Sequence, residues 1–151
     1  MMEIIELKQR QDSKAAEIYA QFEMLLKELR KKELSQNSIG SINSYVEKIN
    51  ASAFEGNDLK KLVKQSQTSI LKEVEKEHKI VAKNYYRNIW MLLGFTAFGL
   101  PIGMLFGLSI GNMGMLGVGL PIGMVIGLAV GSSMDKKALA EGRQMDLEIK
   151  Y

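Results

Sequence analysis

Charged side chains are absent from one long stretch of the chain. Residues 88–134 form a run of 47 positions without Asp, Glu, Lys or Arg, bounded by Arg87 and Asp135. A bilayer core about 30 Å thick requires about 20 apolar residues per helical crossing. The run is therefore long enough for two crossings, and the Gly-Asn-Met-Gly sequence at 111–114 is its most turn-like point. We predict a two-helix transmembrane hairpin with spans at 89–110 and 115–134.

The alternative is a buried hairpin in the core of a soluble protein. All 20 basic and 17 acidic residues lie in the remaining 104 positions, which is too little chain to cover so large an apolar surface. Basic residues flank the run on both sides, and the connecting turn carries no charge. These flanking residues are Lys79, Lys83, Arg87, Lys136, Lys137 and Arg143. The positive-inside rule then places both termini in the cytoplasm.

Each predicted span contains a copy of a glycine repeat. The sequence GLPIGMLFGLSIG begins at residue 99, and GLPIGMVIGLAVG begins at residue 119. The four-residue spacing puts each set of glycines along one helical ridge, where backbones can approach closely in lipid. The ridge glycines are Gly99, Gly103, Gly107, Gly111, Gly119, Gly123, Gly127 and Gly131. The ridges pack either within one hairpin or between chains around a narrow, apolar pore, and both interpretations stand at this point. Pro101 and Pro121 each remove a helical hydrogen bond and predict a kink or gate in each span.

The N-terminal part is predicted to be helical and cytoplasmic. Residues 1–57 form a helical pair, with helices at about 2–34 and 39–54, and apolar residues from Ala15 to Leu29 follow heptad steps. Residues 58–88 form a stalk helix that runs without a stop signal into the first span, as one rod from 59 to about 98. We expect a parallel coiled-coil stalk in a homo-oligomer, with a tetramer favoured, rather than a monomeric three-helix bundle. Residues 135–151 are expected to be a cytoplasmic tail.

Candidate chemistry is sparse. There is no Cys and one His, so disulfide and thiolate chemistry are excluded, and no carboxylate–His cluster has metal-ligand spacing. The match of residues 107–111 to the G-x-S-x-G nucleophile elbow lies in the glycine repeat and lacks a later His. His78 is interpreted as a solvated helix residue. We predict that the protein is not an enzyme and that it needs no cofactor or metal.

Two basic clusters are the remaining candidates for a site. They are Arg30, Lys31 and Lys32 at the end of the first helix, and Lys60, Lys61 and Lys64 at the start of the third. If the helices pack antiparallel, the clusters meet, and an oligomer would multiply them into a ring for a nucleotide or short oligonucleotide. The competing interpretation is a solvated face with positive charge at a helix C-terminus.

The repeated Gly-Leu-Pro-Ile-Gly-Met segments resemble glycine-zipper two-span membrane proteins. The layout of a helical cytoplasmic part followed by two C-terminal spans is also similar to the small membrane effectors of bacterial antiviral defence, such as the channel-like effector of the Hailong system. This resemblance implies an oligomeric channel or pore in the inner membrane, controlled by the cytoplasmic part. The alternative is a non-conducting anchor or scaffold for a cytoplasmic protein partner, and a third option is a holin-like or immunity protein.

Overall fold

The computed structural model describes residues 3–10 and 12–149, and its regular elements over these residues are helices. The all-helical class expected from the sequence is therefore confirmed. The helices are α1 (Ala16–Arg30), α2 (Gln36–Ala51), α3 (Gly56–His78), α4 (Tyr85–Leu93), the π-helix η1 (Gly94–Gly99), α5 (Leu100–Ile110), the 3-10 helix η2 (Met113–Met115) and α6 (Leu116–Ala140). They belong to two compact units. We call residues 3–81 with 145–149 the bundle, and residues 82–144 the hairpin.

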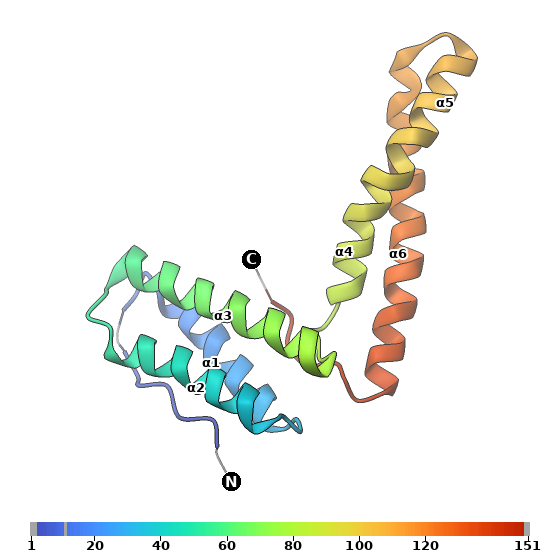
Figure 1. The fold of residues 1–151 in the computed structure, drawn as a ribbon. Coiled ribbons are helices and arrows are strands. Elements are labelled where there is room, and N and C mark those ends of the chain that lie inside the picture. Colours follow the sequence, from blue (N-terminus) through green and yellow to red (C-terminus); the bar gives the residue numbers. More distant parts are fainter. Residues whose placement is uncertain (1–2, 11, 150–151) are drawn as a thin grey trace. The chain divides into compact units, whose positions relative to one another are not determined.

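In the bundle, α1, α2 and α3 lie side by side (Figure 1) and share one apolar core. The heptad positions of α1 and the apolar stripe of α3 both face this core, so they are covered within one chain. The fully buried side chains include Phe22, Leu25, Leu29, Ile42, Val46, Ile49, Val63, Ile70 and Val74. The apolar stripes from which a coiled-coil stalk between chains was expected are thus covered by a three-helix bundle within one chain, and the structure does not confirm the stalk.

Two segments outside the helices complete the core of the bundle, and the sequence pattern did not indicate them. Residues 3–10 form no helix and bury Ile4, so the predicted helix at 2–34 is shortened to α1; residue 2 lies outside the described residues. Residues 145–149 bury Met145, Leu147 and Ile149 at alternate positions. The expected tail at 135–151 is therefore wrong over its described part, because α6 occupies its first residues and the bundle core takes 145–149.

The predicted rod from 59 to 98 is broken. Helix α3 ends at His78, and Lys79 and Asn84 adopt left-handed backbone conformations, with φ of 56° and 60°. Between them, Ile80 and Val81 are buried in the bundle, and the Val81 carbonyl oxygen accepts a hydrogen bond from the Met145 N–H at 2.9 Å. The stalk predicted at 58–88 therefore ends before the first span. The free energy gained by burying Ile80 and Val81 outweighs the free energy that continuing the helix would give.

The hairpin contains two helices long and apolar enough to cross a membrane, at Tyr85–Ile110 and Met113–Ala140. In each, 17% of the most apolar window is buried, whereas a core helix of a soluble protein would be mostly covered. The chain reverses at the predicted turn, where Gly111 has a φ of 69° and the Asn112 side chain accepts the Gly114 N–H at 2.9 Å. Figure 1 shows α4 and α5 running beside α6.

The two prolines of the repeat are accommodated differently. Pro101 lies in the first turn of α5, directly after the π-helical segment η1, whose wider turn changes the hydrogen-bond pattern just before the proline. Pro121 lies inside α6, which the structure describes as one continuous α-helix. A π-helical segment thus precedes the proline of the first span but not that of the second, and the kinks expected at both prolines stay a prediction.

Substitution of Gly127 by Ala should destabilise the hairpin. A Cβ at Gly127 would lie 2.0 Å from the Trp90 carbonyl oxygen, whereas a Cβ at Gly117 would meet no atom within 4 Å. Gly127→Ala should cost roughly 1–3 kcal/mol through overpacking, while Gly117→Ala should be neutral or stabilising through helix propensity. The fluorescence of Trp90 during SDS titration in mild detergent measures both. Equal midpoints for the two variants would contradict the packing described here.

Candidate functional site

The predicted ridge glycines lie at the contact between the two helices of the hairpin. A Cβ at Gly119 would lie 2.1 Å from the Gly103 nitrogen, and a Cβ at Gly103 would lie 2.3 Å from the Leu116 carbonyl oxygen. Further along, a Cβ at Gly123 would lie 2.3 Å from the Gly94 carbonyl oxygen. Real Cβ atoms do not come this close, so the two backbones approach each other only because side chains are missing. Gly94 lies before the first copy of the repeat, so the repeat did not identify it as a contact residue.

Six of the eight ridge glycines take part in this contact. Gly127 and Gly131 are as crowded as the three above, and a Cβ at Gly99 would lie 3.1 Å from the Leu120 Cα atom. The other two are different, because Gly107 has ordinary contact distances of 3.4 Å or more and Gly111 has open space around its Cβ position. Of the two interpretations of the repeat, the structure places most of the ridge inside a single chain.

Asp135, the first charged residue after the apolar run, closes the base of the hairpin. Its side chain is buried, and its two carboxylate oxygens accept the backbone N–H groups of Tyr86 and Arg87 at 3.1 and 2.9 Å. These amides belong to the first turn of α4, whose N-cap residue, Asn84, makes no side-chain capping hydrogen bond. The carboxylate therefore caps α4 from the opposite helix. Sequence spacing gave no signal for this contact, since the residues are almost 50 positions apart.

The two basic clusters do not meet. Asp12, just before α1, accepts the Gly56 N–H at the start of α3, and Ser38 near the start of α2 contacts Glu77 and His78 at the end of α3. Hence α1 and α3 run parallel to each other. Helix α2, which lies between them in the sequence, runs antiparallel to both. Arg30, Lys31 and Lys32 lie at the end of α1, and Lys60, Lys61 and Lys64 lie at the start of α3, so the clusters are roughly 20 Å apart. The convergence that the sequence analysis allowed is therefore wrong, because it required α1 and α3 to be antiparallel.

Members of the first cluster have partners within the bundle. The Arg30 guanidinium donates to the carbonyl oxygens of Ile4 and Ile5 and holds the N-terminal segment. Lys31 pairs with Glu28 at 2.5 Å, and this bond holds the pKa of the Glu28 carboxyl below its ordinary value. Arg30 also lines a cavity of about 710 Å³ that contains Glu33, so the charge there is mixed.

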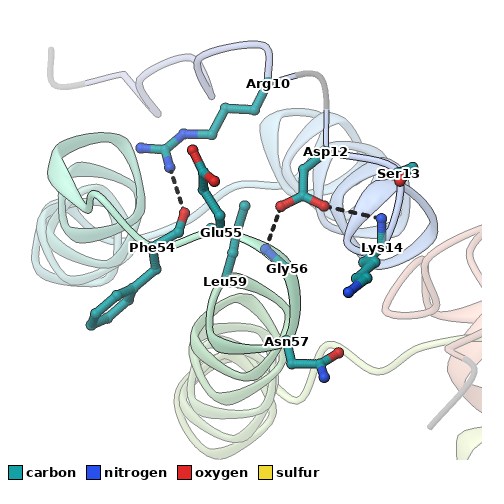
Figure 2. A pocket seen from close by; sticks show the side chains of 9 residues that line it. All are labelled: Arg10, Asp12, Ser13, Lys14, Phe54, Glu55, Gly56, Asn57 and Leu59. Carbon is teal, nitrogen blue, oxygen red and sulfur yellow. Dashed lines mark hydrogen bonds between the residues drawn. The ribbon is translucent and has the colours of Figure 1, made fainter.

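A second cavity, of about 820 Å³, lies where the N-terminal segment meets the start of α3 (Figure 2). Asp12 and Lys14 approach it from the start of α1, and Arg10 approaches it from the N-terminal segment. Asp12 accepts the N–H groups of Gly56, Lys14 and Ala15, and the Gly56 bond is the main cause that lowers the pKa of the carboxyl. The Asp12 carboxylate at this cavity is therefore engaged in holding the backbone.

Arg10 illustrates that structural role. Its guanidinium donates to the carbonyl oxygens of Ile49, Asn50, Ser52 and Phe54, which lie at and just after the end of α2. The last carbonyl groups of a helix lack intrahelical donors and favour positive charge. Arg10 therefore caps α2 from a segment far away in the sequence.

Two asparagines of α2 hold the same segment through bidentate amide contacts. Asn43 accepts the Ile5 N–H at 2.9 Å and donates to the Glu3 carbonyl oxygen at 2.9 Å. Asn50, two turns later, repeats this pattern with Lys8 and Glu6, at 2.8 and 3.0 Å. The seven-residue spacing of the asparagines is the one sequence signal that could have indicated an extended partner.

His78 is half-buried and belongs to a hydrogen-bonded network with the buried Ser38. The Ser38 hydroxyl donates to Glu77 at 2.6 Å and lies 2.9 Å from the His78 Nε2 atom and 3.0 Å from the Ser35 hydroxyl. Ser38 is fully buried, and its proton is committed to Glu77. The arrangement therefore joins the start of α2 to the end of α3 and does not present a nucleophile.

Among residues 3–10 and 12–149, no group of three His, Asp or Glu side chains is placed to hold a metal ion. Comparison of the chain with family models, curated proteins and solved structures finds no match.

Asp12 should contribute to the stability of the bundle in a pH-dependent way. Its pKa is lowered in the folded state, so its contribution is fully present above its unfolded pKa, about 3.9, and is lost as the pH falls through the lower folded value. Asp12→Asn should therefore lower the unfolding midpoint at pH 6, and the difference from the wild-type chain should shrink toward pH 2. Thermal unfolding of the full chain in detergent measures this, with Asp58→Asn, an exposed carboxylate in the first turn of α3, as the control. A pH-independent difference would contradict the assigned role.

Proposed function

We propose that this chain is an integral membrane protein whose hairpin anchors the bundle at the cytoplasmic face of a bacterial inner membrane. One observation carries the proposal: the glycine contact is closed within one chain, while the outer surface of the hairpin is apolar. Leu92, Leu105, Leu108 and Val125 are each 66–73% exposed on that surface. In water such a surface would be a severe liability, whereas lipid covers it at no cost.

The bundle is built from chain segments on both sides of the hairpin, and this supports a topology with two membrane crossings. Residues before the hairpin and residues 145–149 after it fold into the same compact unit. Both ends of the hairpin must then lie on the same side of the membrane. The six basic flanking residues favour the cytoplasm as that side. This argument from folding is independent of the argument from charge.

The hairpin favours an anchor over a conducting pore. Its exposed surface includes many large apolar side chains, and the Thr96 hydroxyl donates to the carbonyl oxygens of Leu92 and Leu93 in its own helix. A single hairpin closed by backbone contact also has no lumen. The bundle, which carries the polar surface, is then the functional part, and the hairpin confines it to the membrane beside a cytoplasmic protein partner.

A second candidate is the oligomeric channel of antiviral defence implied by the resemblance. The observation in its favour is that Gly111 and Gly117, near the tip of the hairpin, have no atom within 4 Å of their Cβ positions. These uncovered glycines would let hairpins of a homo-oligomer, such as a tetramer, approach one another. A signal from the bundle would then have to pass through the short connections at 79–84 and 141–144, because neither α3 nor α6 continues from one unit into the other.

The proposed topology predicts the pattern of cysteine labelling. The natural chain has no Cys, so each single-cysteine variant is read without background. Met113→Cys, at the tip of the hairpin, should react with a membrane-impermeant maleimide from outside spheroplasts. Met24→Cys, at a similarly exposed methionine of the bundle, should react only after the membrane is opened. Labelling of Met24→Cys in intact spheroplasts would overturn the orientation.

The anchor also predicts an absence of conductance. The purified chain in liposomes should remain membrane-bound after carbonate extraction and should give no potassium flux above that of empty liposomes, since the two helices of a single hairpin are in close backbone contact and leave no lumen between them. Gly117→Leu, which adds bulk at the uncovered tip, should leave both results unchanged. Flux from the natural chain that Gly117→Leu abolishes would replace the anchor by the channel.

A further inference from the structure

A groove between α2 and α3 carries positive charge alone. It encloses about 570 Å³, and its charged lining residues are Lys48 on α2 and Lys64 and Lys72 on α3. Lys64 was a candidate in the sequence, but Lys48 and Lys72 were not. Two further cavities of the bundle each contain carboxylates, namely Asp12 and Glu55 in one and Glu3 and Glu33 in the other. The groove is thus set apart by the sign of its charge.

The helical spacing accounts for the three lysines around one groove. Lys64, Thr68 and Lys72 follow each other at four-residue steps, which places them along one face of α3. Lys48 stands on the neighbouring helix, one turn after Tyr45, which also lines the groove. The two walls therefore both present ammonium groups.

These ammonium groups are exposed, and no ion pair or side-chain hydrogen bond neutralises them within residues 3–10 and 12–149. By contrast, Lys31 in the first predicted cluster is paired with Glu28. Three cations around a shared hollow produce a positive potential that attracts a multivalent anion. Lysine binds phosphate as a flexible point charge, which suits a ligand with several phosphate oxygens.

The rest of the lining suits a ligand that is not purely inorganic. Leu62 and the half-buried Tyr45 provide an apolar part of the wall, and Ser69 supplies a hydroxyl group. The volume lies within the range of cavities that take small organic ligands, about 300–1,000 Å³.

We propose that this groove binds a ligand that carries at least two phosphate charges, held by Lys48, Lys64 and Lys72. The less polar part of the ligand packs on Leu62 and Tyr45. A soluble phosphoanhydride and the phosphomonoester headgroup of a lipid share this chemistry. The inference deepens the proposed function by giving the anchored bundle a ligand, but its test in detergent does not depend on membrane insertion.

The first experiment compares two triple variants with the same change in charge. In Lys48→Gln/Lys64→Gln/Lys72→Gln the groove is neutralised, and in Lys60→Gln/Lys61→Gln/Lys76→Gln three exposed lysines of α3 outside the groove are neutralised. Calorimetric titration of the full chain in neutral detergent uses ATP and inorganic tripolyphosphate as probes. The groove variant should raise the Kd by about tenfold or more, and the control should stay within about threefold.

The second experiment distinguishes the two sources of phosphate. The same three chains are titrated with phosphatidic acid in mixed micelles, with phosphatidylcholine as the neutral reference. Binding of phosphatidic acid that depends on the groove lysines assigns a lipid headgroup, and groove-dependent binding of the soluble probes alone assigns a soluble ligand. Absence of binding by all probes, or equal loss in both triple variants, would overturn the proposal. Native far-UV circular dichroism of both variants verifies that the helices remain folded.

Discussion

The structure depends on one constraint: the chain must enter and leave the hairpin at the same place. Ile80 and Val81, which precede the hairpin, share a core with Met145, Leu147 and Ile149, which follow it. The break in the helix after His78 follows from this, because a rod that continued into the hairpin would carry Ile80 and Val81 out of the core. Within the hairpin, the contact between the glycines keeps the two long apolar helices side by side. The chain that leaves along one helix therefore returns along the other.

Much of the hairpin could be predicted from the sequence, because the bilayer is a simple solvent with strict demands. An uncharged run of 47 residues is hard to accommodate in a water-soluble fold of this size, and glycines at four-residue spacing predict close approach whatever the neighbouring residues are. The partner of the glycine ridges was harder to foresee. Gly111 and Gly119 look alike in the sequence, yet one lies open at the turn and the other meets Gly103.

The bundle shows where such reasoning fails. Heptad steps in α1 predicted its buried face correctly, but periodicity cannot tell whether that face meets another chain or its own. Residues 3–10 looked helical because nothing local stops a helix there, while the contacts that extend them come from Asn43, Asn50 and Arg30, far along the chain. The polar groove likewise needs two helices to bring Lys48 beside Lys64 and Lys72, so the sequence indicated only one of the three.

The Asp135 cap has a consequence for the order of biosynthesis. Translation proceeds from the N-terminus, so the first span is made while the amides of Tyr86 and Arg87 still lack the carboxylate that will accept them. The start of α4 acquires its cap only when the second span has been completed, and the bundle core is filled later still, when residues 145–149 emerge from the ribosome. The first apolar helix thus stays energetically incomplete until the second is made, which couples the folding of the base of the hairpin to the completion of both helices.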